Sequence, residues 1–113
     1  MRNKNPKFFL KDILDSINKI EQYVKKKTKN EFLKNYEKQD AIMKRIEIIG
    51  EAIKNIPIGI KKKYPEIPWK DIAGMRNILV HEYFGVCMER VWDTAKNDIP
   101  KLKKQIVVLL EKF

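Results

Sequence analysis

The chain has 113 residues, enough to bury one hydrophobic core but not two, so we expect a single domain over residues 1–113. Its residues are 43% apolar and 35% charged, with four glycines and five prolines, which favours an all-α protein over a turn-rich sheet protein. The net charge of +10 indicates a polyanionic partner such as RNA, DNA or anionic lipid, although lysines that only solvate helix faces explain it equally well. A single cysteine excludes an internal disulfide and a multi-cysteine zinc site, and favours the cytoplasm.

The first predicted element is an amphipathic helix that ends near Val24. From Phe9 onward, apolar residues recur every three or four positions with charges between them. The short apolar run before it is ended by Lys11 and Asp12, far short of a signal-peptide core. No stretch approaches the roughly 20 apolar residues that a membrane span needs, so no membrane association is expected.

A long second helix is expected over residues 32–56, after a solvated lysine-rich turn at residues 25–30. Thr28 or Asn30 could cap this helix, and Pro57 ends it. With more than 20 residues, it would be the spine against which the other helices pack. Its small residues Gly50 and Ala52 predict a close helix crossing.

The next segment, rich in proline, predicts a connector that contains at most one short helix around Ile60 to Lys63. A third helix is expected from Trp69 to about His81, with Gly74 inside it and Gly85 as its terminator. Because glycine costs a helix roughly 1 kcal/mol relative to alanine, Gly74 indicates a need for close packing or ligand access.

Helical spacing continues from Val91 to Phe113, across most of the C-terminal third. Pro100 should interrupt or kink this element. Asp98, two residues earlier, could cap a fresh helix whose first turn contains the proline.

The chemistry of the chain is concentrated in one segment that contains Arg76, Asn77, His81 and Tyr83. On a helix these four positions occupy about half of the circumference. Histidine moves a proton near neutral pH and arginine grips phosphate, which suits phosphodiester cleavage, with the amide of Asn77 as an orienting group. From spacing alone, a core histidine at a helix end beside a surface arginine is the favoured interpretation.

Cleavage through a ribose 2′-hydroxyl benefits from both a base and an acid, yet the chain has one histidine. A symmetric dimer would supply two, so a composite site in a dimer cleft is the resulting hypothesis.

Other residues have a structural and a functional interpretation. Trp69 and Trp92 could stack bases, but core packing is favoured. Cys87 is interpreted as an inert thiol rather than a nucleophile. The cluster Lys61-Lys62-Lys63-Tyr64 is the best candidate for an RNA-backbone patch, with a solvated turn as the favoured alternative.

The segment Arg76-Asn77-x3-His81-Glu82-Tyr83-Phe84 resembles the R-x4-H-x-Y motif of HepT-like toxins in the HEPN ribonuclease superfamily. The resemblance covers about residues 8 to 110, and includes residues 49–52, residues 68–74, Val91-Trp92 and residues 98–100. It implies an all-α, HEPN-like bundle of four or five helices, homodimeric, that acts as a metal-independent endoribonuclease toxin of a type VII toxin–antitoxin system without a cofactor.

The same resemblance implies roles for single residues. Arg76 and His81 correspond to the catalytic pair, Asn77 to a supporting group, and Tyr83 to the tyrosine that an antitoxin of the minimal nucleotidyltransferase (MntA) type modifies with AMP. The implied partners are thus RNA, the antitoxin and a second copy of the chain, with a larger assembly with the antitoxin left open. Cys87 stands where the family commonly has an aspartate, which puts a helix cap in doubt.

Glu51 could contact the site, but a solvent-exposed or inter-helix ion pair is the favoured interpretation, and it is not assigned to the catalytic set. Two alternatives to the toxin remain open. One is a non-catalytic helical module that binds a nucleotide or a nucleotidyltransferase, and the other is a basic helical protein that binds DNA or membrane.

Overall fold

The structure is a computed structural model that describes residues 5–83 and 88–113, without the side chains of residues 77–83. Within those ranges the regular elements are all helical, which confirms the expected all-α class. They are α1 (Pro6–Val24), α2 (Lys29–Lys34), α3 (Tyr36–Lys54), α4 (Ile58–Lys63), α5 (Trp69–Tyr83), α6 (Met88–Asp93), the π-helical turn η1 (Thr94–Asp98) and α7 (Ile99–Leu110).

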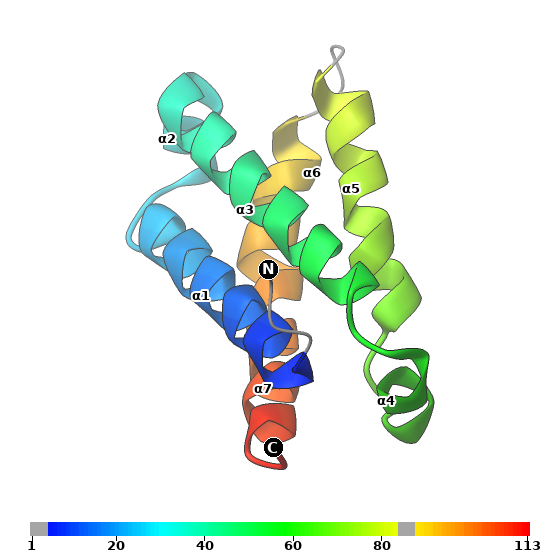
Figure 1. Ribbon diagram of the computed structural model, residues 1–113. Helices are drawn as coiled ribbons and strands as arrows, with labels where there is room; N and C mark the ends of the chain where they lie inside the picture. Colours follow the sequence, from blue (N-terminus) through cyan, green and yellow to red (C-terminus); the bar gives the residue numbers. More distant parts are fainter. Residues whose placement is uncertain (1–4, 84–87) are drawn as a thin grey trace.

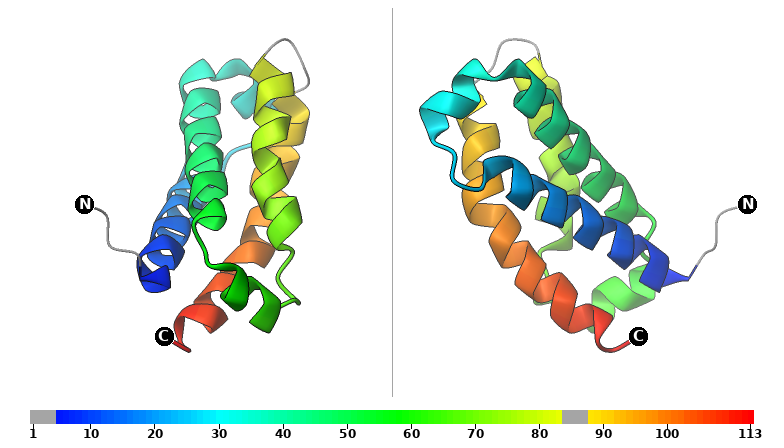
Figure 2. Two further views of the ribbon diagram at one scale, coloured as in Figure 1. Left: turned by 45° about the vertical axis from the view of Figure 1, so that its right-hand side comes forward. Right: turned by 90° about the vertical axis from the view of Figure 1, so that its left-hand side faces the viewer.

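Helix α3 lies at the centre of the bundle. It packs against α1 on one side and against α5 on the other, while α1 also packs against α7 (Figure 1). The two further views show α3 running antiparallel to both α1 and α5 (Figure 2). The expectation that the helix around Gly50 is a spine for its neighbours is therefore confirmed for α1 and α5.

The core is formed by the apolar stripes of these helices. In α1 the residues Ile13, Ile17 and Ile20 are fully buried, and in α3 Ile42, Ile49 and Ile53 have no exposed surface and belong to the same core cluster. Burying such a side chain contributes roughly 1.5–3 kcal/mol, so the helices are held mainly by this shared face. None of the helices in the described ranges combines the length and the apolarity needed to cross a membrane.

The expected single long second helix is wrong, because the chain breaks at Asn35 into α2 and α3. The Asn35 side chain accepts a hydrogen bond from the backbone N–H of Lys38, which caps α3. The side-chain amide of Gln39 donates to the carbonyl groups of Phe32 and Leu33 at 3.0 and 3.2 Å. These bonds satisfy backbone groups on both sides of the break and so stabilise the corner.

Thr28, rather than Asn30, caps α2 through a reciprocal capping box with Glu31. The hydroxyl of Thr28 accepts from the Glu31 N–H at 3.1 Å, and the Glu31 carboxylate accepts from the Thr28 N–H at 2.9 Å. The backbone hydrogen bond from Thr28, and then its side-chain hydrogen bond, lower the pKa of the Glu31 carboxyl below its usual value of 4.5.

Around Pro100, a new helix begins as expected with the proline in its first turn, but the expected side-chain cap by Asp98 is wrong. Asp98 has helical backbone angles, and its side chain makes no capping hydrogen bond. The chain instead passes through η1, where the N–H of Ile99 donates to the carbonyl of Thr94, five residues earlier. Pro100 then sits in the first turn of α7, where its missing N–H is tolerated.

Candidate functional site

Helix α5 carries the four residues singled out in the sequence, and its first turn is firmly anchored. The indole N–H of Trp69 donates to the carbonyl of Tyr64 at 3.0 Å, and the N–H of Ile72 donates to the carbonyl of Pro68 at 3.0 Å. Trp69 and Trp92 are both buried, which confirms the core interpretation of the two tryptophans. The start of α5 is thereby fixed relative to the core.

Arg76 lies on the side of α5 that packs against α3, and the methylene groups of its side chain cross Gly50. A Cβ atom at residue 50 would lie 2.5 Å from Cγ and 2.7 Å from Cδ of Arg76. No real Cβ tolerates such distances, so only glycine leaves room for the arginine in this position. The close crossing predicted at Gly50 is confirmed. The group that lies nearest to the glycine is the Arg76 side chain, with the α5 backbone behind it.

The guanidinium group of Arg76 forms an ion pair through Nη1 with the Glu51 carboxylate. The two side chains are 33% and 52% exposed, so water screens the attraction. Exposed pairs contribute on the order of 0.2–1 kcal/mol, too little for this pair to hold the fold together. The ion pair expected for Glu51 is present, and its partner is the candidate catalytic arginine.

Asn77, His81 and Tyr83 lie on the helical backbone of α5, so the predicted helix, extended by two residues, carries the whole motif. His81 follows Asn77 by one turn, and Tyr83 follows Arg76 by two turns. Their side chains, and the residues Gly85 and Cys87, are outside the described part of the structure. The roles assigned to these residues therefore stay predictions.

Gly74 has open space around it. No described atom outside its own helix lies within 4 Å of the Cβ that a larger residue would add there. The packing reason expected for this glycine is therefore not seen among the described residues. Positions 74, 77 and 81 follow one face of α5 at spacings of three and four, so the space at Gly74 is next to the face that carries His81.

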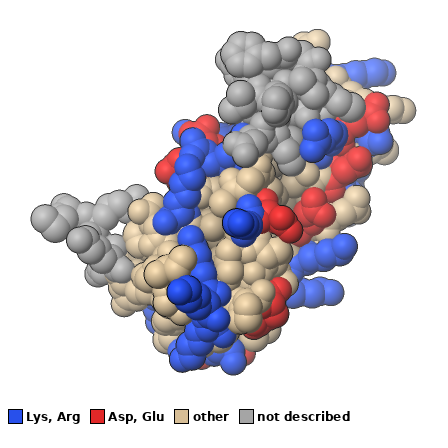
Figure 3. Space-filling view, turned by 90° about the vertical axis from the view of Figure 1, so that its right-hand side faces the viewer, with Lys and Arg blue, Asp and Glu red and all other residues tan. Residues whose placement is uncertain are grey.

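On the face of the molecule seen in Figure 3, the charged residues of the described chain are mixed. Lys and Arg side chains are interspersed with Asp and Glu over the middle and upper part of this face and gather at its lower left, with uncharged surface between them. This pattern does not form one continuous basic surface. Net charge alone therefore does not locate a polyanion on this face, and Arg76 is the candidate group for binding a phosphate.

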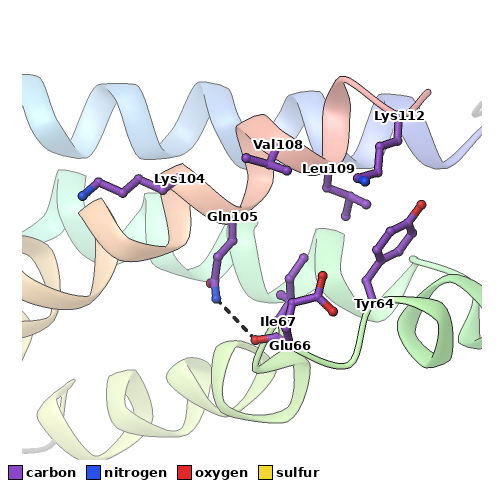
Figure 4. Close-up of a pocket in the computed structure, with 8 residues that line it drawn as sticks. All are labelled: Tyr64, Glu66, Ile67, Lys104, Gln105, Val108, Leu109 and Lys112. Carbon is purple, nitrogen blue, oxygen red and sulfur yellow. Dashed lines mark hydrogen bonds between the residues drawn. The ribbon is translucent and has the colours of Figure 1, made fainter.

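Tyr64 lines a pocket of about 270 Å³ between the segment before α5 and the end of α7, with Glu66, Ile67, Lys104, Gln105, Val108, Leu109 and Lys112 (Figure 4). The ammonium groups of Lys63 and Lys112 each lie 5.8 Å from the centre of the Tyr64 ring. The pocket adjoins the first turn of α5, roughly 20 Å along the helix from Tyr83. The RNA-backbone patch predicted at residues 61–64 remains a prediction.

Groups of three or more His, Cys, Asp or Glu side chains that could hold a metal ion are absent from residues 5–76 and 88–113.

The helical fold and the sequence of α5 are consistent with one class of protein, a small helical ribonuclease of HEPN type, and comparison with known families shows this class. The family model for "Ribonuclease HepT-like" proteins matches residues 13–109, and the chain belongs to this family. The expectation of an RNA-cleaving enzyme is thereby confirmed at the level of the family.

The chain is 50% identical over 110 residues to a γ-glutamylcyclotransferase and candidate RNase of Methanocaldococcus jannaschii, covering 97% of this chain and 50% of that protein. It is 42% identical over 111 residues to another candidate RNase of that organism, covering 98% of this chain and 92% of that one. A "Probable ribonuclease HepT" of Thermococcus cleftensis is 44% identical over 100 residues, covering 88% of this chain and 91% of the relative. The chain thus spans only half the length of the first relative. No solved structure matches significantly.

Proposed function

We propose that the chain is the toxin of a type VII toxin–antitoxin system, a metal-independent endoribonuclease that cleaves RNA through the 2′-hydroxyl. The observation that carries this proposal is Arg76, which stands at the head of the R-x4-H-x-Y segment and is held by Gly50 and Glu51 with its guanidinium partly open to solvent. A guanidinium in such a position can donate to a phosphate and stabilise charge that develops on it.

In the proposed reaction, the imidazole of His81 removes the proton from the ribose 2′-hydroxyl. The 2′-oxygen attacks phosphorus, the bond from phosphorus to the 5′-oxygen breaks, and an acid returns a proton to the leaving oxygen. Arg76 stabilises the pentacovalent phosphate, and Asn77 orients the imidazole or the phosphate. The products are a 2′,3′-cyclic phosphate and a free 5′-hydroxyl.

The base and the acid come from two subunits in this proposal. One chain has a single histidine, so a symmetric dimer that brings two α5 segments into one cleft supplies both groups. We expect the cleavage activity per subunit to fall as the protein is diluted, in parallel with the dimer fraction measured by sedimentation. A fully active monomer would refute the composite site.

Regulation is proposed to act on Tyr83. A nucleotidyltransferase antitoxin of the MntA type transfers AMP from ATP to the phenolic oxygen and releases pyrophosphate. The bound AMP brings a negative phosphate to the helix that carries Arg76, where it competes with the RNA phosphate. Co-expression with such an antitoxin should add one or more AMP masses to a peptide that contains Tyr83, and Tyr83→Phe should remove the addition.

The central experiment measures cleavage of a labelled RNA by purified protein in the presence of EDTA. We expect cleavage to persist, the products to end in a 2′,3′-cyclic phosphate, and an all-2′-deoxy strand of the same sequence to remain intact. Arg76→Ala and His81→Ala should each abolish cleavage and keep the helical circular dichroism spectrum, whereas Arg45→Ala on α3 serves as the matched arginine control. Salt-sensitive RNA binding without cleavage would favour the non-catalytic alternatives.

A further inference from the structure

The ion pair between Arg76 and Glu51 joins the candidate catalytic arginine to a residue of a different helix. Glu51 is on α3 and half exposed, directly after the glycine that the Arg76 side chain crosses. We propose that Glu51 is a positioning residue, which together with Gly50 holds the Arg76 guanidinium in the orientation that RNA cleavage requires. This inference rests on the proposed ribonuclease function.

Two contacts restrict two different parts of the same side chain. Gly50 leaves room for Cγ and Cδ, which sets the direction in which the chain of methylene groups leaves α5. Glu51 then fixes the far end by accepting a charge-assisted contact from Nη1. An arginine on a helix surface otherwise samples many rotamers, and the two contacts narrow this range before any ligand arrives.

The geometry leaves donors for a phosphate. A guanidinium carries five N–H donors in a rigid plane, and a contact through Nη1 leaves the donors on Nη2 and Nε available. Because the plane is rigid, orienting one end also orients the other end. The carboxylate thus acts on the reaction through Arg76 and need not touch the RNA.

The α3 helix supplies a matched control one turn before Glu51. Glu47 is also an exposed glutamate, and its carboxylate pairs with Lys44 of the same helix at 3.6 Å instead of with Arg76. Changing either glutamate to glutamine removes one negative charge from nearly the same part of the molecule. A general electrostatic effect on RNA binding would therefore be shared by both variants, whereas loss of positioning would be confined to Glu51.

The test compares Glu51→Gln, Glu51→Asp and Glu47→Gln in steady-state cleavage of one RNA. We expect Glu51→Gln to lower kcat by about two- to fivefold with KM essentially unchanged, since a partly exposed ion pair biases the orientation of the guanidinium by no more than about that factor and acts on rate rather than on binding. Glu51→Asp should recover part of the lost kcat, and Glu47→Gln should have the kcat and KM of the protein without substitutions. A rise in activity on Glu51→Gln would mean that the carboxylate competes with phosphate for Arg76, and would overturn the proposal.

A second readout does not depend on activity. In ¹⁵N NMR spectra, the guanidinium of Arg76 should show slow rotation about its Cζ–Nε bond in the unmodified protein and in Glu47→Gln, and fast rotation in Glu51→Gln. Unchanged rotation in Glu51→Gln would refute the positioning role, even if cleavage fell. In an Arg76→Lys background, Glu51→Gln should cause a much smaller additional loss of kcat, because the group that it orients is gone.

Failure of this inference can be distinguished from failure of the proposed function. If Arg76→Ala leaves cleavage intact, the ribonuclease site is wrongly assigned and the role of Glu51 falls with it. If Arg76→Ala abolishes cleavage while Glu51→Gln behaves as Glu47→Gln does, the site stands and only the positioning role is wrong.

Discussion

Replacing Gly50 by alanine tests the packing of Arg76 most directly. The added methyl group would lie 2.5 Å from Cγ and 2.7 Å from Cδ of Arg76, so the arginine must leave its place over α3 or the helices must separate. Alanine in the middle of a helix favours folding by about 1 kcal/mol relative to glycine. Overpacking costs about 1–3 kcal/mol. The net change in the free energy of unfolding is therefore expected to stay within about 2 kcal/mol.

Activity should respond more strongly than stability. A displaced Arg76 no longer presents its guanidinium in the same position, and we expect kcat/KM for RNA cleavage to fall at least tenfold. Urea denaturation measures the stability, and cleavage of a labelled RNA measures the activity. Gly59→Ala on α4 is the control, because no described atom lies within 4 Å of its added Cβ and cleavage should be unaffected.

The result that would refute this reasoning is full cleavage activity in Gly50→Ala together with an unchanged NMR signal for the Arg76 guanidinium. It would mean that the arginine does not need the space over Gly50. If Gly50→Ala instead lowers the free energy of unfolding by more than about 4 kcal/mol, moving the Arg76 side chain alone is not enough for α3 and α5 to accommodate the methyl group.

Ile53→Ala should lower the free energy of unfolding by about 2–5 kcal/mol in urea denaturation, because the side chain is fully buried in α3, whereas Ile58→Ala, at a residue 69% exposed, should change it by less than about 1 kcal/mol. Thr28→Ala should cost about 1 kcal/mol through loss of the α2 cap, and equal stability would refute the capping role. Because the pKa of the Glu31 carboxyl is lowered in the folded protein, its ionised form stabilises the fold above pH 4.5, and this contribution should disappear as the pH falls through the pKa of Glu31 in the folded state. Glu31→Gln should remove this part of the pH dependence of the free energy of unfolding.

Most of the helices were predictable because their apolar spacing coincides with the buried face. Phe9, Ile13 and Val24 in α1 follow this rule, as do Ile99, Leu102 and Ile106 in α7. The break at Asn35 was missed because apolar spacing continues across it. What decides that corner is local hydrogen bonding by the side chains of Asn35 and Gln39, which hydrophobic periodicity does not report.

The motif on α5 could be found in the sequence because arginine, amide, imidazole and phenol occur together only there. The ion pair of Arg76 with Glu51 could not be assigned, because the two residues are 25 positions apart and their meeting depends on how α3 crosses α5. Gly50 was the available signal. A small residue in the middle of a long helix indicates that another group approaches, but the sequence alone does not say which group.

The π-helical turn at Thr94–Asp98 contains one residue more than a regular α-helix needs, so the chain should tolerate the deletion of one residue there. A hydrogen bond that spans five residues takes up one residue more than the regular four-residue span. Val91, Ala95 and Ile99 therefore stay aligned toward the core, whereas eight residues of uninterrupted α-helix would turn Ile99 about 80° away from Val91. Evolution could remove one exposed residue here, such as Lys96, and restore an ordinary helix without turning α7 out of the core. Elsewhere in these helices, a one-residue deletion would rotate every later side chain by about 100°.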